Sequence, residues 1–154
     1  MSINHLSLYI IACIFPFISF AQKIYHPARG SEERKAHMKA LHTTFDGKFK
    51  DQQIVFEADS ASYKSNGQWC FLRVDIYQRS GKRVDFKKST YKELWTDGSM
   101  DSNGIYALLQ QIKSEWKLIA YFDFPLDVPY GCWWKQYKVP KQIFPYTEPA
   151  SNCE

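Results

Sequence analysis

Apolar side chains recur at helical spacing in the part of the chain that follows residue 30. Met38, Leu41 and Phe45 are separated by three and four residues, so a helix places them in one stripe. Ser31 precedes two glutamates, which is typical of an N-cap followed by acidic residues at the positive end of the helix dipole. The pattern predicts a helix that begins after Ser31, ends before Asp46 and is covered by a sheet.

Most of the remaining chain alternates between apolar and polar positions, the pattern of strands with one buried face. Two pairs of such runs predict antiparallel hairpins, the first with a type I′ turn at Asn66-Gly67. Its returning strand carries apolar residues on both faces, so both are expected to be partly covered. We expect strands at residues 52–63, 69–77, 105–112 and 116–124, with shorter ones at 83–86 and 91–95.

An aromatic run near the C-terminus has the spacing of a helix. Tyr130, Trp133, Trp134 and Tyr137 lie at positions i, i+3, i+4 and i+7, which predicts a short helix, and the prolines beyond it predict an irregular tail from about residue 139. The predicted fold class is therefore α+β. It comprises an N-terminal helix on an antiparallel sheet of four to six strands, a short aromatic helix and the tail, in a single domain over residues 22–154.

The first 21 residues contain no lysine, arginine, aspartate or glutamate. Their apolar run at 8–21 is 14 residues long and interrupted by Pro16, whereas a membrane-spanning helix needs roughly 20. Ser19 and Ala21 place small side chains at the −3 and −1 positions of a signal-peptidase site. We expect residues 1–21 to be a cleaved signal peptide, and the protein to be exported to the periplasm or the extracellular space without a membrane span.

Two other interpretations of this segment stay open. Without cleavage, the same residues would anchor the protein in the membrane. Residues 10–13 also resemble a lipobox, in which Cys13 would carry a lipid anchor, although apolar residues follow Cys13 where a lipoprotein has a polar tether.

Cleavage would leave three cysteines, an odd number in an oxidising compartment. Cys70 alternates with Leu72 and Val74 on the apolar face of a predicted strand, so we expect it to remain a free thiol. Cys132 and Cys153 would then pair and close a loop of about 20 residues, which contributes roughly 3 kcal/mol in the chain-entropy model.

The net charge of +4 is spread along the chain and gives no support to nucleic-acid binding. The densest basic cluster surrounds a predicted Ser-Gly turn and is accounted for by a solvated hairpin end. Its members are Arg79, Lys82, Arg83, Lys87 and Lys88.

The usual motifs of metal, phosphate and nucleophile chemistry are missing from the sequence, so we predict no cofactor and no metal and assign no catalytic residue. The run DGSMDSNG spaces oxygen-bearing side chains like a calcium loop, but Ser102 and Leu108 stand where an EF-hand requires Gly and Glu. His37 and His42 lie five residues apart, a spacing that does not let one helix face present both to a metal. Both histidines are expected to be solvated.

The aromatic stripe of Tyr130, Trp133, Trp134 and Tyr137 is the first candidate binding surface. Clustered tryptophan and tyrosine side chains at a surface stack on sugar rings or insert into a partner. Packing of the same side chains in the core is the alternative.

Polar residues on the predicted strands are the second candidate. Arg73, Asp75, Tyr77, Tyr121 and Asp123 would form an acid/base pocket if the sheet gathered them. The alternative is an ion pair between Arg73 and Asp75 on a partly wet sheet face, worth less than ~1 kcal/mol.

The order of helix and hairpins resembles that of cystatin-like and, in particular, NTF2-like domains over residues 31–124. The phrases that carry the resemblance are IVFEADSASYKSNGQWCFLRVDIYQ and IYALLQQIKSEWKLIAYF. The resemblance implies a curved sheet that wraps the N-terminal helix, with a pocket on its concave side. Catalytic members such as ketosteroid isomerase use a carboxylate and a tyrosine in that pocket, but no motif places these roles on numbered residues of this chain.

These observations favour a non-catalytic binding or inhibitory module for a protein or small ligand. The first alternative is an NTF2-like pocket enzyme with acid/base carboxylate chemistry, and the second is a structural protein of the cell envelope. An open pocket on the concave side of the sheet would favour the enzyme, whereas a filled interior would count against it.

Overall fold

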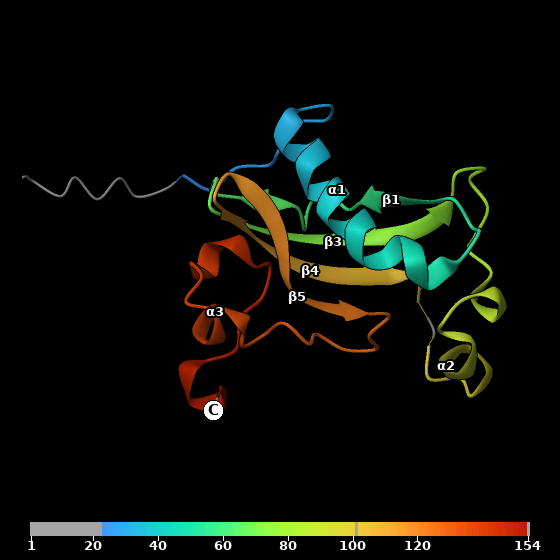
Figure 1. Ribbon diagram of the computed structural model, residues 1–154. Coiled ribbons are helices and arrows are strands. Elements are labelled where there is room, and N and C mark those ends of the chain that lie inside the picture. The colour runs from blue at the N-terminus through green and yellow to red at the C-terminus, as the bar shows by residue number, and fades with distance from the viewer. Residues whose placement is uncertain (1–22, 101, 154) are drawn as a thin grey trace, which may run out of the picture.

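The computed structural model of the protein describes residues 23–100 and 102–153 (Figure 1). One long helix packs across an antiparallel sheet, and short helical turns surround it, so the predicted α+β class is confirmed. The elements are α1 (Glu32–Phe45), β1 (Ile54–Ala58), β2 (Lys64–Ser65), β3 (Trp69–Gln78), α2 (Lys92–Thr96), β4 (Gly104–Ile112), β5 (Glu115–Asp123) and α3 (Trp133–Gln136), with 3₁₀ turns at Asp46–Phe49, Phe86–Lys88, Lys141–Ile143 and Ala150–Asn152. The predicted signal peptide and Cys13 lie outside the described residues.

Helix α1 begins and ends where the sequence predicts. The Ser31 side chain accepts a hydrogen bond from the Arg34 amide over 3.2 Å, and Glu32 and Glu33 occupy the first turn. The helix ends at Phe45, where the chain tightens into a 3₁₀ turn.

The sheet has five strands in the order β1-β3-β4-β5, with β2 also paired to β3, and every pairing is antiparallel. The strand expected over residues 52–63 is shorter than predicted, because only β1 forms within this range and the chain leaves the sheet before β2 begins at Lys64. The first turn is shifted by one residue from the predicted type I′ turn. Asn66 pairs with Trp69, and its Oδ1 accepts the Gln68 and Trp69 amides, which leaves Gly67, with φ of +82°, and Gln68 as the turn.

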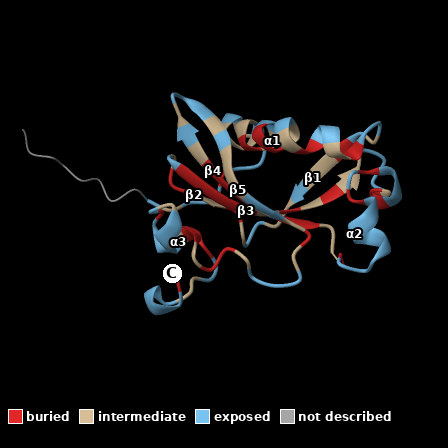
Figure 2. Ribbon diagram, turned by 60° about the horizontal axis from the view of Figure 1, so that its bottom comes forward, coloured by how far each residue is buried: buried red, intermediate tan, exposed pale blue. Residues whose placement is uncertain are grey.

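The inner face of the sheet is the face that packs against α1. Cys70, Leu72, Val74 and Ile76 of β3 alternate onto this face and are fully buried, and Leu41 of the helix stripe packs in the same core. Figure 2 shows buried residues along the central strands of the sheet. Side chains therefore fill the space between the helix and the middle of the sheet.

The outer face is covered in part by the C-terminal segment, residues 130–153. Trp69 and Phe71 point to this side, and the Phe71 ring contacts the rings of Tyr130, Trp133 and Phe144 at centroid distances of 4.7, 6.4 and 5.2 Å. The aromatic α3 and the irregular tail are present as predicted. They pack against the outer face, on the side of the sheet away from α1.

The predicted disulfide joins Cys132 to Cys153, and Cys70 is a buried free thiol. Lys135 donates to the carbonyl oxygens of Ala150 and Cys153, which fastens α3 to the tail a second time. Burial raises the pKa of the Cys70 thiol well above its usual value, so this side chain stays protonated and serves as a small apolar group in the core.

Two strand predictions are wrong at the end of the sheet opposite the disulfide. Residues 91–95 form most of helix α2, since the Ser89 hydroxyl accepts the Tyr91 amide and the Trp95 ring stacks on Phe86. Residues 83–86 make one isolated bridge, between Arg83 and Tyr77, before a 3₁₀ turn begins. No helix within residues 23–100 and 102–153 has the length and apolar character needed to cross a membrane.

Candidate binding groove

The aromatic stripe predicted as a binding surface lies against the outer face of the sheet. Tyr130 and Trp133 are buried there, and Trp134 and Tyr137 are half-buried. Trp134 donates through Nε1 to the Glu148 carbonyl over 3.1 Å, and the Lys141 ammonium lies 3.8 Å from its ring centroid. These contacts join the stripe to the tail, and its role in partner binding stays a prediction.

Arg73 and Asp75 lie on the outer face of β3, beyond the C-terminal segment. The Arg73 Nη2 atom is 3.0 Å from Asp75 Oδ1, so the two side chains form an ion pair, and this oxygen accepts no hydrogen bond from the described residues. Arg73 and Asp75 therefore form the ion pair that was expected as the alternative to an acid/base pocket. Tyr77 is half-buried and shares this face through the strand alternation.

Tyr121 and Asp123 lie on the opposite face and form a separate cluster. Tyr91 donates to Asp123 Oδ2 over 2.6 Å, and the Lys48 ammonium lies 3.4 Å from the same oxygen and 3.0 Å from the Tyr121 hydroxyl. Burial and this carboxylate raise the pKa of Tyr91. The sheet thus separates the residues that an acid/base pocket would gather, and Asp123 is already neutralised by Lys48.

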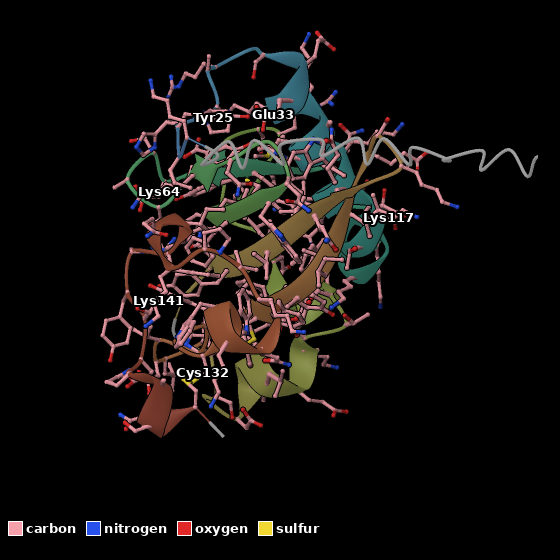
Figure 3. All side chains as sticks on the ribbon, turned by 90° about the vertical axis from the view of Figure 1, so that its left-hand side faces the viewer. Tyr25, Glu33, Lys64, Lys117, Cys132 and Lys141 are labelled. Atoms are coloured by element: carbon pink, nitrogen blue, oxygen red, sulfur yellow. A yellow bond between two sulfur atoms is a disulfide. The ribbon has the colours of Figure 1, made fainter. Side chains whose placement is uncertain are left out.

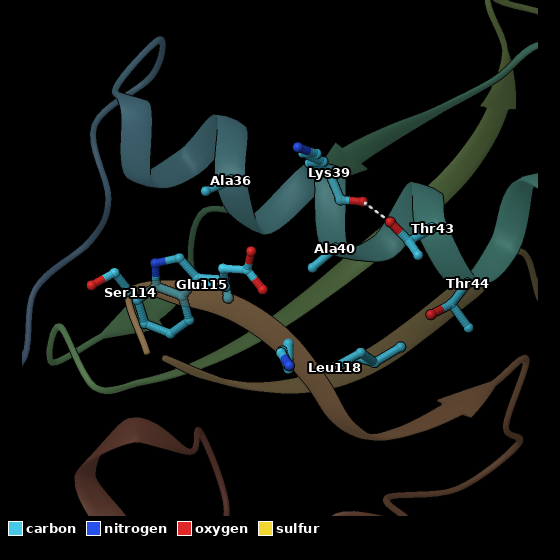
Figure 4. Close-up of a pocket in the computed structure, with 10 residues that line it drawn as sticks. Ala36, Lys39, Ala40, Thr43, Thr44, Ser114, Glu115 and Leu118 are labelled. Carbon is cyan, nitrogen blue, oxygen red and sulfur yellow. Dashed lines mark hydrogen bonds between the residues drawn. The ribbon is translucent and has the colours of Figure 1, made fainter. Parts of the chain in front are cut away.

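The clearest depression beside the sheet is a groove between α1 and β5, with a volume of about 510 Å³ (Figure 4). Its helix wall carries small side chains, among them Ala36, Ala40 and Thr43, which recur at spacings of four and three. Trp116 and Leu118 of β5 form the opposite wall. The groove exists because the small side chains of α1 leave the space beside β5 unfilled.

The groove runs along the free edge of β5. This strand is the last in the sheet order, and no strand of the described residues pairs with its outer side. Lys113 and Ser114 form a two-residue turn, so Ile112 and Glu115 on either side of it are a hydrogen-bonded pair. In an antiparallel ladder, hydrogen-bonded and non-hydrogen-bonded pairs alternate. The backbone amides of Trp116 and Leu118 therefore point away from β4. The groove therefore presents unpaired backbone groups beside apolar side chains.

A second depression of about 360 Å³ continues the groove at the N-terminal end of α1. It shares Ala36, Ser114 and Trp116 with the groove. Tyr25 and Glu33 lie side by side at this end (Figure 3), and Glu32 stands at the rim. We call this depression the acidic recess. The groove itself is bordered by Lys39, Lys117 and Glu115, whereas the charged side chains of the recess are both glutamates, so the two parts differ in charge.

Glu33 is held by hydroxyl groups at the base of the acidic recess. The Tyr25 hydroxyl lies 3.0 Å from each carboxylate oxygen, and Ser65 donates to Oε1 over 2.6 Å. Ser65 is fully buried and contacts the carboxylate directly. This hydroxyl positions Glu33 and is not exposed as a nucleophile.

His37 lies behind the recess and is fully buried, so the expectation of a solvated histidine is wrong. Its Nδ1 is 2.8 Å from the Tyr63 hydroxyl and its ring meets the Trp116 ring edge-on at 4.1 Å, whereas Nε2 has no hydrogen-bond partner. Burial, with a smaller contribution from the nearby Arg34 charge, lowers the pKa of His37 to about 4. The imidazole is therefore neutral at physiological pH.

No group of three or more His, Cys, Asp and Glu side chains in the described ranges is arranged to hold a metal ion. Comparisons of the chain with protein-family models, with curated proteins and with solved structures find no match. The site is therefore characterised by its own geometry.

The groove is not evident from the sequence, because its lining residues belong to no chemical motif. Ala36, Ala40 and Thr43 lie beside the apolar stripe of α1 at the same helical spacing. The apolar stripe already suffices to pack α1 against the sheet. A second stripe of small residues beside it is the signal in the sequence that this face of the helix is partly uncovered.

Proposed function

We propose that the protein is an exported, non-catalytic binding domain that captures an extended polypeptide segment along the free edge of β5. Export is supported by the signal-peptide pattern of residues 1–21 and by the Cys132–Cys153 disulfide, a bond that persists in oxidising compartments. The packing of α1 on an antiparallel sheet supports a distant NTF2-like or cystatin-like relationship for residues 31–124.

The observation that carries the proposal is the small-residue wall of α1 above an unpaired strand edge. An added strand lies about 4.8 Å from its neighbour and directs alternate side chains to opposite faces. On β5 its inner side chains enter the groove between Ala36, Ala40 and Leu118, while its backbone pairs with the outward amides of Trp116 and Leu118. Main-chain hydrogen bonds supply affinity and the groove supplies selectivity, as in other cases of strand addition.

Two features favour binding over the alternatives. The core between α1 and the sheet is filled, and the Asp123 carboxylate is paired with Lys48, which disfavours a pocket enzyme. An open groove beside a free edge is a feature that a purely structural envelope protein does not need.

The proposal is tested with random dodecapeptides displayed on phage and selected on the protein. Selected peptides are expected to bind Ala36→Trp at least about tenfold more weakly, because the indole fills the groove. The matched control is Lys35→Trp, one position along the helix on an exposed side chain that does not line the groove, and its affinity is expected within about twofold of the wild type.

Amide hydrogen exchange locates the bound peptide. Binding is expected to slow exchange at the outward amides of Trp116 and Leu118, and to leave Lys117, which already pairs with β4, unchanged. The proposal is overturned if no peptide is enriched, if Ala36→Trp binds as the wild type does, or if protection falls on β1 or the C-terminal segment.

A further inference from the structure

Glu33 of α1 differs from Asp75 of β3 and Asp123 of β5, two carboxylates of similar exposure, because it has no lysine or arginine partner within the described residues. The side chains of Glu33, Asp75 and Asp123 are 24%, 26% and 29% exposed. Asp75 lies 3.0 Å from Arg73, and Asp123 lies 3.4 Å from Lys48. Among the described residues, no lysine or arginine nitrogen lies within 4.0 Å of Glu33.

In the part of the chain that the structure describes, His37 is the one basic side chain within 4.0 Å of Glu33, and its Nε2 lies 3.8 Å from Oε1. This nitrogen is fully buried and has no hydrogen-bond partner within the described part of the chain. Arg34, next to Glu33 in sequence, places its guanidinium over the Tyr63 ring instead. Glu33 thus receives hydrogen bonds from hydroxyl groups only, and the unpartnered ring nitrogen of His37 lies behind the carboxylate, outside the lining of the recess.

Desolvating a carboxylate is costly unless a cation or several donors compensate it. Tyr25 and Ser65 donate to Glu33, but hydroxyl groups carry no charge. The recess also includes the side chains of Tyr25 and Trp116 in its lining. A carboxylate flanked by aromatic rings is the chemistry that binds an ammonium or guanidinium group, through an ion pair and contacts with the ring faces.

We infer that the acidic recess binds a cationic side chain, lysine or arginine, carried by the segment that docks on β5. The inference rests on the proposed function, because the recess opens into the groove through Ala36, Ser114 and Trp116. The basic residue lies at the end of the docked segment beside Trp116, and the negative charge of Glu33 pairs with it. The groove beyond it takes the apolar side chains.

The recess is tested first with a small cation that needs no groove. Titration of the protein with n-butylguanidinium, followed by NMR, is expected to shift the Trp116 indole and the Ser65 and Gly67 amides. The neutral isostere N-butylurea is expected to leave these signals unchanged. Glu33→Gln keeps the hydrogen-bond acceptor and removes the charge, so it is expected to abolish the shifts.

Glu32→Gln is the matched control, because Glu32 is exposed and already paired with Lys35 at 2.7 Å. It is expected to bind n-butylguanidinium within about twofold of the wild type. The wild-type comparison of the charged and neutral probes decides the question even if Glu33→Gln does not fold. Equal responses to both probes, or none to either, overturn the inference.

The peptides selected for β5 separate this inference from the proposed function. A basic residue is expected at the end beside Trp116, and its replacement by alanine is expected to weaken binding about tenfold. Peptides that bind at β5 with no basic preference, together with no response to n-butylguanidinium, overturn the recess and leave the groove proposal standing. Cation binding at Glu33 without any peptide binding overturns the groove proposal and leaves the recess as a cation site.

Discussion

The two faces of the sheet are covered by segments that use opposite kinds of side chain. On the outer face, aromatic rings of the C-terminal segment surround Phe71 and bury it completely. On the inner face, α1 fills the centre of the sheet but places Ala36 and Ala40 above its β5 edge, where a groove remains. The comparison teaches that the aromatic-rich region closes a surface, whereas the region of small side chains leaves one open.

Phe71 provides the strongest test of the closed face. Phe71→Ala is expected to lower the free energy of unfolding by about 4 kcal/mol, because it removes a buried ring and leaves a cavity among aromatic neighbours. Urea denaturation measures the change. Glu57→Ala, an exposed position on neighbouring β1, is expected to stay within about 0.5 kcal/mol of the wild type. A loss below about 1.5 kcal/mol for Phe71→Ala would mean that the C-terminal segment barely stabilises the sheet.

The disulfide tests how much of the closed face depends on a covalent link. Replacing both Cys132 and Cys153 by serine is expected to cost about 3 kcal/mol, since the bond closes a loop with a sequence separation of 21 in the unfolded chain. Reduction of the wild type is expected to reproduce this loss and to leave the double variant unchanged. An effect of reduction on the double variant would contradict the assignment.

His37 makes the α1 side sensitive to acid. Its pKa is about 4 in the folded protein and 6.5 when exposed, so the stabilisation by the neutral form is complete above pH 6.5 and is lost as the pH falls towards 4. The difference corresponds to about 3 kcal/mol at low pH. Urea denaturation from pH 7 to 4 is expected to show this loss in the wild type and in His42→Gln, and a flatter profile in His37→Gln. Equal profiles for the two variants would exclude His37 as the origin.

Substitution by a larger side chain compares the open groove with the closed outer face directly, and its expected effects are the smallest. Ala36→Leu is expected to change stability by less than about 0.5 kcal/mol, because the side chain extends into the groove. Gly131→Ala is expected to cost about 1 kcal/mol, because its Cβ would lie 2.8 Å from Glu148 Cγ in the C-terminal segment. Thermal unfolding of both variants measures the contrast, which would disappear if the groove were closed in solution.

The elements were predictable where a local pattern fixes them. The Ser31 cap and the apolar stripe locate α1, period-two alternation locates β3, β4 and β5, and the odd cysteine count led to the pairing found. The strand prediction for residues 91–95 was wrong because this short segment mixes apolar and charged residues in an order that fits either a strand or a helix. Tertiary contacts, such as the stacking of Trp95 on Phe86, accompany the helical form.

The candidate site was less predictable, because a pattern along one segment does not say which other segment covers it. The alternation in β3 indicates that Trp69 and Phe71 face one way, but not that the C-terminal segment meets them there. The aromatic stripe attracted a binding hypothesis for the same reason. Ala36 and Glu33 acquire their significance only from the position of β5 and Ser65, which lie far away in the sequence.

Every strand of the sheet precedes the C-terminal segment in the chain, and this order has a consequence for biogenesis. While the polypeptide emerges, Trp69 and Phe71 remain on a bare apolar surface until residues 130–153 arrive and oxidation joins Cys132 to Cys153. A nascent chain halted before that point offers a hydrophobic surface to chaperones and proteases. Burial of Trp69 and Phe71 therefore waits for the last part of the domain to be made.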